Sequence, residues 1–566
     1  MPARSSRSAL PSRYSAIRNR TEPAPSSARC SEVFAVDTLL VGGEIVDGTG
    51  SQRRRCDVGL SGDRIAYIGL SDDVTARQTL DCRDMIVTPG LIDPHSHSDW
   101  SVLGNADAMS TIHQGVTTEV VGNCGVTYAP LSEHDVAGAC ASLRSMGYEG
   151  PVDWRSFPDL LTRVHSAGTA QNLMWFVGHT AIRAAAHGRA ESAGIDEERE
   201  RIRLLEEAMD AGAIGLSSGL EYGSGRFSRT EELAQLARVV GRRHGMYASH
   251  IRNRDHGLGA AVDEFFSIVN AAQVRAQLSH LNVRHNTGAQ PGAWERAVED
   301  VMKQRRSGTD VLADMTPYPH GIGLAAGLLP DWLADRPAAE AAALLNDPEI
   351  RQRVRQDSDR YWRFVHAGQW DRVRLGVSAT HPHWQGLTFP EIACQQGQDE
   401  WDCLFDVLAA AGADLGGVQL MGELFTAEHV AEAVGHDHFL LGVDAFTTRH
   451  DGPLAARTRH PLFFYGHTHY LAHHVPAGTL SLEESVHKMT GMVAEHFGIR
   501  GRGRLVVGAH ADVVVFDPAI LDRTDTWKVP QGYADAARHV WVNGTPVVSD
   551  AVRTPHRPGR QLTQHN

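Results

Sequence analysis

The chain has 566 residues, of which 42% are hydrophobic and 22% charged, and these proportions exclude a mostly disordered chain. The formal net charge of −14 argues against nucleic acid as the main partner. No run of about 18 apolar residues occurs, so we expect no membrane-spanning segment. The seven cysteines form no CxxC pair. A reducing compartment fits this pattern, and we expect a cytoplasmic protein.

The first 35 residues differ from the rest, because they are rich in Arg, Ser, Ala and Pro and contain only two acidic residues, Glu22 and Glu32. This composition is typical of a disordered extension, and an organellar transit peptide is the alternative. The segment has no apolar core like that of a secretory signal. We therefore predict a disordered tail over residues 1–35.

Two β-rich regions flank the middle of the chain. Residues 36–88 consist of short apolar runs separated by Gly and Asp, and the same texture returns over residues 496–556. This pattern predicts short antiparallel strands with tight turns. We expect both ends of the chain to build one small composite β-sandwich domain.

The middle of the chain, residues 89–495, alternates apolar runs with amphipathic helical segments, which predicts an α/β fold. Eight such runs alternating with helices predict a TIM-like (β/α)8 barrel. Such a barrel needs about 250 residues. The surplus predicts an insertion at about residues 320–430, close to the barrel mouth. The predicted strands are MIVTPGLID, GVTTEVVGN, NLMWFVGH, AIGLSSGL, MYASH, AQLSH, TDVLADM and HFLLGVDA.

Residue types that bind metal ions follow several of these predicted strands. In PGLIDPHSHSD, His95 and His97 project to the same side of an extended segment. His250, His280 and Asp444 close three later strands. Because all strands of a parallel barrel end at one face, these side chains are expected to meet there. Imidazoles in such a group are typical ligands of zinc.

A second metal ion beside the first would need an anionic ligand that bridges the two ions. The scarcity of lysine limits which residue can provide it. The chain has three lysines, and none lies between His97 and His280, which excludes a carboxylated lysine from that part of the site. Cys124 follows the second predicted strand in GVTTEVVGNCG. A thiolate is a good zinc ligand, so Cys124 is the candidate in its place. A buried, inert cysteine is the alternative.

The sequence resembles the D-aminoacylase (N-acyl-D-amino-acid deacylase) family of the amidohydrolase superfamily from about residue 38 to residue 520. The resemblance is carried by the segments PGLIDPHSHSD, QGVTTEVVGNCGVTYAP, GHTAIR, GAIGLSSGLEYGSG, YASHIRNR, LSHLNV, ADMTPYP, GVDAF and SLEESVHKMTGMVAEHFGIRGRGRLVVGAHADVVVFDP. By this resemblance, Cys124, His250 and His280 would hold one tight Zn²⁺. His95 and His97 would form a weaker second site, and Asp444 would be the catalytic aspartate.

The resemblance implies a zinc-dependent amidohydrolase that cleaves the amide bond of N-acyl amino acids, with the D form favoured. Asp444 would act first as general base and then as general acid. The substrate's carboxylate needs a cation or hydrogen-bond donors. For substrate binding we predict Tyr222, Arg252, Arg183 and Tyr318. For each arginine, a structural ion pair is the alternative.

Three segments depart from the family pattern and predict an altered substrate pocket. Tyr318-Pro319-His320 stands where the family has Tyr-Pro-Tyr, and Asn253-Arg254 stands where it has an acid. A histidine-rich segment, RHPLFFYGHTHYLAHH, follows Asp444. We interpret its histidines as a mostly polar helix or loop face. These histidines are His467, His469, His473 and His474.

Other functions remain open from the sequence. The protein could hydrolyse another linear or cyclic amide, and a catalytically silent barrel used for binding is a further alternative. We expect a small-molecule amide substrate, no nucleic acid and no membrane partner. The oligomeric state, including a homo-oligomer, is open.

Overall fold

The computed structural model describes residues 34–70, 74–187, 194–358, 361–521 and 532–564. All but the last two residues of the tail predicted over 1–35 therefore lie outside the described residues. Among the described residues, none of the helices combines the length and the apolar character that crossing a membrane requires.

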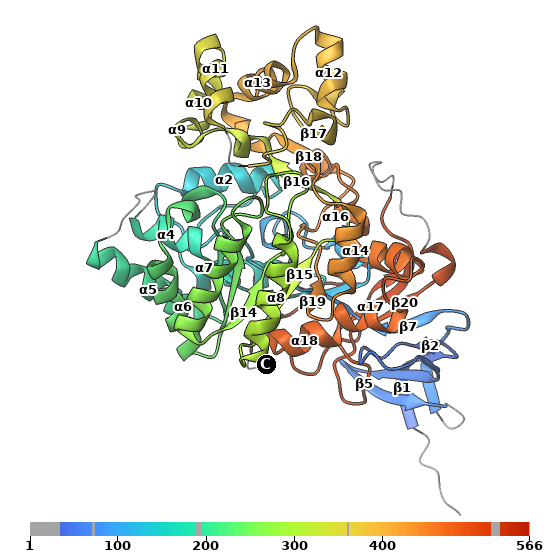
Figure 1. Ribbon diagram of the computed structural model, residues 1–566. Helices are drawn as coiled ribbons and strands as arrows, with labels where there is room; N and C mark the ends of the chain where they lie inside the picture. The colour runs from blue at the N-terminus through green and yellow to red at the C-terminus, as the bar shows by residue number, and fades with distance from the viewer. Residues whose placement is uncertain (1–33, 71–73, 188–193, 359–360, 522–531, 565–566) are drawn as a thin grey trace, which may run out of the picture.

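A ring of parallel strands forms the centre of the molecule (Figure 1). The two sheets of this ring meet where Ser96 pairs with Ala445 as a parallel bridge, and the amide of Asp444 donates to the carbonyl of His95 at 2.9 Å. The predicted (β/α)8 barrel is thus confirmed. Its strands are β8 (Leu91–Asp93), β9 (Val116–Val121), β10 (Asn172–Trp175) with β11 (Val177–Gly178), β12 (Gly215–Gly219), β13 (Met246–His250), β14 (Arg275–Leu278), β15 (Val311–Met315) and β19 (Phe439–Leu441).

Two of the predicted strands are divided in the structure. The segment MIVTPGLID splits at Gly90 into β7 (Ile86–Pro89), which belongs to a β-sheet outside the barrel, and β8 of the barrel. A Cβ atom at Gly90 would lie 2.1 Å from the Thr117 hydroxyl, so the chain can pass between the two sheets there only as glycine. The segment NLMWFVGH is interrupted at Phe176, between β10 and β11.

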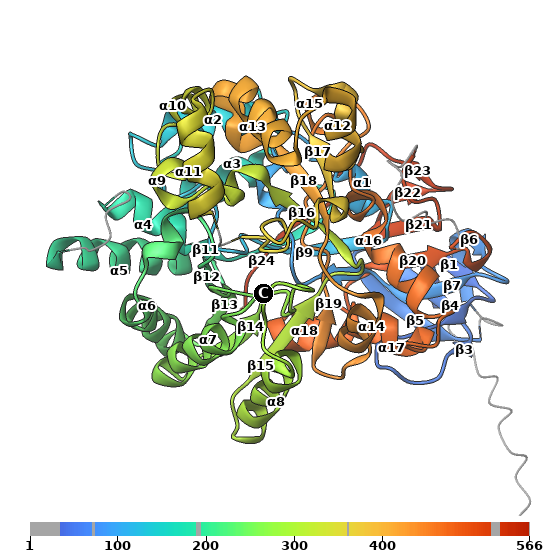
Figure 2. The same cartoon turned by 45° about the horizontal axis from the view of Figure 1, so that its top comes forward.

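Helices cover the outside of the barrel, and Figure 2 shows β11 to β15 inside an arc formed by α4 to α8. Amphipathic spacing explains this packing, since Leu233, Leu236, Ala237 and Val240 of α6 are buried at intervals of three and four. The covering helices include α3 (Phe157–Ala167), α4 (His179–His187), α5 (Ile195–Asp210), α6 (Thr230–Arg242), α7 (Leu258–Ala272), α8 (Ala293–Arg306), α14 (Ala427–Gly435), α17 (Leu482–Lys488) and α18 (Gly491–Phe497).

Two sheets lie at one side of the barrel (Figure 1): one contains strands of the N-terminal part alone, and the other combines strands from both ends of the chain. A core that includes Leu40, Val58, Val513 and Trp541 is shared by strands of both sheets. The domain boundaries predicted within this region stay a prediction. One sheet has the order β5 (Arg64–Gly69), β4 (Asp57–Ser61), β1 (Phe34–Val41), β6 (Val74–Asp81); the other has β23 (Val552–Arg553), β22 (Thr545–Ser549), β21 (Ala537–Val542), β20 (Val513–Phe516), β7, β2 (Glu44–Ile45), β3 (Arg54–Arg55).

A long segment between β15 and α14 rises above the barrel at the top of Figure 1. Because it leaves from the carboxyl end of β15, it stands on the face where the predicted site residues lie. Its antiparallel sheet has the order β16 (His320–Leu324), β18 (Gln419–Glu423), β17 (Val373–Val377). Its main helices are α9 (Asp331–Ala334), α10 (Ala338–Leu344), α11 (Pro348–Asp357), α12 (Phe389–Gln396) and α13 (Glu400–Ala411).

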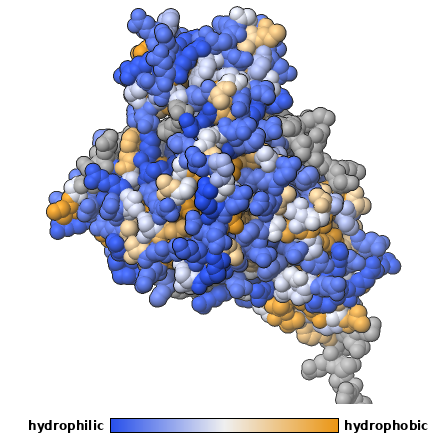
Figure 3. Space-filling model, viewed as in Figure 1, coloured by the Kyte–Doolittle hydropathy of each residue, from blue (hydrophilic) through white to orange (hydrophobic). Residues whose placement is uncertain are grey.

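The surface of the face in view is mostly hydrophilic over the barrel and the upper segment (Figure 3). Hydrophobic residues gather at the foot of the molecule, over the small β-sheets (Figure 3). Large exposed hydrophobic residues from this part of the chain include Phe34, Leu70, Val506 and Val507.

The C-terminal segment returns to the barrel, a position that no sequence pattern predicts. Strand β24 (Gln561–Leu562) pairs in parallel with β10, next to Leu173 and Met174. The Leu562 side chain is 5% exposed and belongs to a core cluster that includes Phe176 and Phe497. The last strand therefore fills the gap beside β10 at the amino end of the barrel.

We expect Leu562→Ala to lower the free energy of unfolding by about 2–4 kcal/mol, because it empties a buried leucine site. Leu324→Ala is the matched control, since Leu324 is 52% exposed, and it should change stability by less than about 0.5 kcal/mol. Urea denaturation of both variants measures the difference. Equal stability of the two variants would show that β24 does not contribute to the core.

Candidate metal centre

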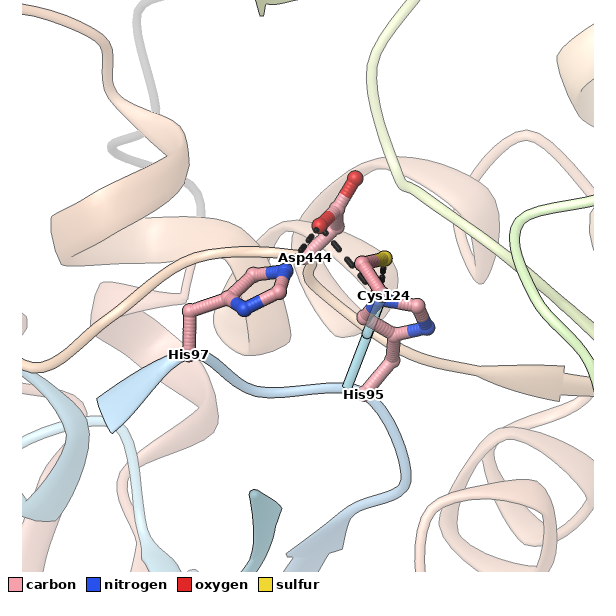
Figure 4. Close-up of side chains that lie close together, drawn as sticks. All are labelled: His95, His97, Cys124 and Asp444. Atoms are coloured by element: carbon pink, nitrogen blue, oxygen red, sulfur yellow. Dashed lines mark hydrogen bonds and ion pairs between the residues drawn. The ribbon is translucent and has the colours of Figure 1, made fainter. Parts of the chain in front are cut away.

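The ends of the barrel strands bring the predicted ligand residues together. His95 and His97 follow β8, Cys124 follows β9, and His250 is the last residue of β13. His280 and Asp444 follow β14 and β19. In Figure 4, His95, His97, Cys124 and Asp444 converge on one small volume. The residues that can share an ion form two groups, His95, His97, Cys124 with Asp444, and Cys124 with His250 and His280, each with ligand atoms within 4.8 Å of one another.

The sulfur atom of Cys124 is common to both groups. It lies 3.3 Å from Nε2 of His95 and 3.5 Å from Nε2 of His280. A tetrahedral zinc ion, with Zn–S of about 2.3 Å and Zn–N of about 2.0 Å, separates two such ligand atoms by about 3.5 Å. The donor set and its spacing therefore fit zinc. Cys124 is 2% exposed and His280 1% exposed, so such an ion would be held away from bulk water.

Buried carboxylates orient two of the imidazoles. The Nδ1 atom of His95 lies 3.2 Å from Asp314, which also accepts the backbone amide of His280 at 2.8 Å. The Nε2 atom of His250 lies 2.9 Å from Glu221, which leaves Nδ1 as the nitrogen that His250 can offer to an ion. A carboxylate on the outer nitrogen fixes the tautomer and the ring orientation of a ligating histidine. Neither Asp314 nor Glu221 is among the site residues predicted from the sequence. Asp314 was detectable, since it lies in the predicted strand TDVLADM.

The backbone is strained at three of the site residues. Cys124, His280 and Asp444 have φ angles of 53°, 33° and 57°, in the left-handed region that residues with a side chain rarely adopt. Such conformations persist only where the surrounding structure enforces them, and they concentrate at functional sites. The strain here turns three side chains toward one another at the end of the barrel.

Asp444 lies between the imidazoles and the solvent. One carboxylate oxygen is 3.1 Å from Nε2 of His97 and 3.4 Å from Nε2 of His95 (Figure 4). The side chain is 32% exposed, whereas those of His95 and His97 are 0% and 8% exposed. Asp444 is therefore the member of this group that an incoming molecule meets.

The electrostatics of the cluster favour charged groups. Burial opposes ionisation of Cys124, but the neighbouring charges of His95 and His280 hold the pKa of its thiol well below the usual value. Burial also opposes the charge on Asp444, but His280, His95 and His97 lower its pKa to about 2. A thiolate and a carboxylate at neutral pH are the forms that bind a cation.

Tyr222, predicted to bind substrate, lies at the edge of the cluster. Its ring packs edge-on against His250, with 4.8 Å between the centroids. Its hydroxyl donates to the backbone carbonyl of Cys124 at 3.3 Å.

The two predicted arginines are held elsewhere. Arg183 of α4 is 0% exposed and forms an ion pair with Glu232 of α6 at 2.5 Å. Arg252 forms an ion pair with Glu264 of α7 at 2.9 Å and donates to the carbonyls of Arg226 and Ser228. Both guanidinium groups join elements of the barrel wall, so the alternative of a structural ion pair describes them.

Tyr318 lies among imidazoles. Its ring stacks on His469 and His320, at centroid distances of 4.1 and 5.1 Å, and meets His460 edge-on at 5.5 Å. The interpretation of the histidine-rich segment as a polar face was wrong for three of its members, because His467, His469 and His474 are at most 3% exposed. Burial lowers the pKa of His467 to about 3 and that of His474 to about 4, so these rings pack as neutral groups.

Comparison with known proteins agrees with this geometry. A model of the amidohydrolase family matches residues 78–316 and 444–548. The chain is 31% identical over 531 residues to a D-aminoacylase from Alcaligenes xylosoxydans xylosoxydans, covering 93% of this chain and 98% of the relative.

Two solved structures are also similar. The crystal structure of N-acyl-D-glutamate deacylase from Bordetella bronchiseptica, complexed with zinc and a phosphonate inhibitor that mimics the tetrahedral intermediate, superposes with a TM-score of 0.76 at 29% identity, covering 93% of this chain and 99% of that one. A D-aminoacylase studied for its binuclear metal centre gives 0.74 at 27% identity, covering 93% and 100%. The chain therefore belongs to the amidohydrolase family, in its D-aminoacylase branch.

We expect Cys124→Ala to lose most of its bound zinc, because the thiolate is common to both groups of candidate ligands. Cys403→Ala is the matched control, since Cys403 is also buried but lies in α13, above the barrel. Elemental analysis of both purified variants gives the zinc content per chain. Full zinc occupancy in Cys124→Ala would refute the ligand assignment.

The Glu232 carboxylate lies at 2.5 Å from Arg183, 2.8 Å from Arg201 and 2.9 Å from His179. Burial opposes its charge, but His179 and Arg183 lower its pKa below the ordinary value. A depressed pKa gives stability that is present above the unfolded value of about 4.3 and is lost as the pH falls toward the folded value.

We expect Glu232→Gln to lower the free energy of unfolding at pH 7 by about 3 kcal/mol, because two buried arginines lose their partner. The neighbouring Glu231→Gln, on an exposed residue, should change it by less than about 0.5 kcal/mol. Denaturation from pH 7 to pH 3 should show the gap between wild type and Glu232→Gln narrowing below about pH 4. A difference in the free energy of unfolding that stays constant with pH would contradict the lowered pKa of Glu232.

Proposed function

We propose that the protein hydrolyses the amide bond of N-acyl amino acids, with the D form favoured, as a zinc-dependent deacylase. One observation supports this above the others. A buried thiolate and several imidazoles meet beside a half-exposed aspartate at the carboxyl end of the barrel, in a chain of the D-aminoacylase branch. The D preference rests on the names of the relatives, one a D-aminoacylase and one an N-acyl-D-glutamate deacylase.

Two sets of residues would hold zinc. We assign Cys124, His250 and His280 to one tight site, and His95 and His97 to a weaker second site beside it. When bound, zinc supplies a Lewis acid that polarises the amide carbonyl and lowers the pKa of water toward about 7. The thiolate adds negative charge that stabilises the cation, and the outer-nitrogen partners Glu221 and Asp314 keep the rings in position.

Asp444 would carry the proton. Hydrolysis needs a base to accept a proton as water attacks the carbonyl carbon, and an acid to protonate the nitrogen as the C–N bond breaks. Asp444 lies 3.1 Å from His97 and has an exposed side, so it can contact both the water and the amide nitrogen. One carboxyl group can perform both steps, because it gains the proton in the first step and returns it in the second.

A second candidate is hydrolysis of another linear or cyclic amide by the same groups. The packing of Tyr318 between His469 and His320 favours it, because the sequence predicts an altered pocket at Tyr318-Pro319-His320. Rates measured with N-acyl amino acids and with cyclic amides distinguish the two candidates. A homo-oligomer and a cytoplasmic location stay predictions.

We expect zinc-loaded protein to hydrolyse N-acetyl-D-amino acids in preference to the L forms, and Asp444→Asn to lower kcat/KM by about a thousandfold. Asp437→Asn is the matched control, since this exposed aspartate precedes the amino end of β19. Rates come from a colorimetric assay of released amine, with and without a chelator. Activity that survives both chelation and Asp444→Asn would reject the mechanism, and activity confined to cyclic amides would favour the second candidate.

A further inference from the structure

One arginine reaches the candidate metal centre. Arg254 lies in the loop after β13, and its Nη1 atom is 3.0 Å from Nδ1 of His280. Its Nη2 atom is 3.4 Å from Glu221, and its side chain is 11% exposed. Its Nε atom is buried and has no hydrogen-bond partner among the described residues. The guanidinium therefore has donor capacity to spare beside the proposed zinc ligands.

Glu221 does not depend on Arg254. Two nitrogens of Arg284 donate to the carboxylate of Glu221 at 2.6 and 2.7 Å, and His250 lies at 2.9 Å. Arg284 is fully buried and also pairs with Asp255 at 3.0 Å. Because these contacts are shorter than that of Arg254, Glu221 stays satisfied if Arg254 moves away.

The contact between Arg254 and His280 is incompatible with a metal on His280. A guanidinium has only donors, so Nδ1 of His280 must accept, and a neutral ring then carries its proton on Nε2. Nε2 is the nitrogen that faces the sulfur of Cys124 at 3.5 Å, and it must offer its lone pair to bind an ion. With an ion on Nε2, the proton of the neutral ring would have to lie on Nδ1, where two hydrogen-bond donors would face each other.

A carboxylate resolves this conflict. An anion can accept hydrogen bonds both from a guanidinium and from an N–H of an imidazole, and arginine binds carboxylates with paired hydrogen bonds. Arg183 and Arg252 are held by Glu232 and Glu264. Arg254 is thus the arginine that contacts a candidate ligand and has an unpartnered donor.

We propose that Arg254 binds the carboxylate of the N-acyl amino acid, and that metal binding at His280 releases its guanidinium for this role. The inference rests on the proposed function, since it names the residue that selects substrates with a free carboxylate. It makes Arg254 a specificity-determining residue whose position depends on metal loading.

The first test measures zinc affinity and needs no activity. Metal-free wild type, Arg254→Gln and the exposed control Arg306→Gln are titrated with zinc against a chromophoric chelator. Arg254→Gln should bind zinc on the order of tenfold more tightly than wild type, because a competing donor and charge are gone. The control should match wild type. Unchanged or weaker binding by Arg254→Gln would overturn the release of Arg254 by metal.

The second test measures ligand binding without turnover. Zinc-loaded Asp444→Asn protein is titrated by calorimetry with N-acetyl-D-alanine, N-acetyl-D-leucine and N-acetyl-D-methionine, and with the uncharged amide of each. Relative to the Asp444→Asn protein, the double variant that also carries Arg254→Gln should bind the acids more weakly, on the order of tenfold or more. Its affinity for the amides should change by less than about twofold. Adding Arg254→Lys should give an intermediate loss, because the charge stays but the paired hydrogen bonds do not.

These outcomes separate the inference from the proposed function. Equal losses for acids and amides, or no binding of any acid by the Asp444→Asn protein, would overturn the carboxylate role of Arg254. Failure of the wild type to hydrolyse any of these acids would instead reject the proposed function. Thermal unfolding of each variant identifies changes caused by misfolding, and Arg254→Lys retains a cation beside Glu221 if Arg254→Gln is unstable.

Discussion

The site depends on a buried, negatively charged sulfur atom, that of Cys124, at the carboxyl end of the barrel. A thiolate at 2% exposure is costly unless hydrogen-bond donors, cations or metal ions surround it, and here the imidazoles of His95 and His280 lie at 3.3 and 3.5 Å. Each imidazole must then present a chosen nitrogen, which requires a partner on the other nitrogen. Asp314 and Glu221 meet that need for His95 and His250. The negative charge on the Cys124 sulfur thus explains why imidazoles surround it and why carboxylates contact those imidazoles.

The barrel closes through the same residues. The backbone of Asp444 donates to His95, and Ala445 pairs with Ser96, so the last strand meets the first beside the site. Left-handed backbone at Cys124, His280 and Asp444 costs on the order of 1–3 kcal/mol at each position. The packed barrel beneath them can enforce these conformations because its strands are buried. Stability of the barrel and geometry of the site are therefore linked.

Sequence reasoning succeeded where one geometric rule was enough. Parallel strands end on one face, so His250, His280 and Asp444 could be placed together without coordinates. The ion-pair partners of Arg183 and Arg252 could not be predicted, because Glu232 and Glu264 lie on helices whose packing against these arginines depends on tertiary contacts. The burial of His469 against Tyr318 could not be predicted either, because it depends on a contact between segments far apart in the sequence. The pairing of β24 with β10 could not be predicted, because the segment is short and its hydrophobic pattern is weak.

The loops that follow the barrel strands contain residues that can change substrate selectivity. The residues that would bind metal lie at strand ends, whereas Arg254 lies in the loop after β13, in the Asn253-Arg254 segment where the resemblance to the family predicts an acid. Arg254 places a cation beside His280 and Glu221, while Arg284 pairs with Glu221 independently of it. A cation at this position attracts an anionic group of a substrate, and an acid would repel it. Selectivity can therefore change through one loop residue while the metal ligands and the catalytic aspartate stay the same.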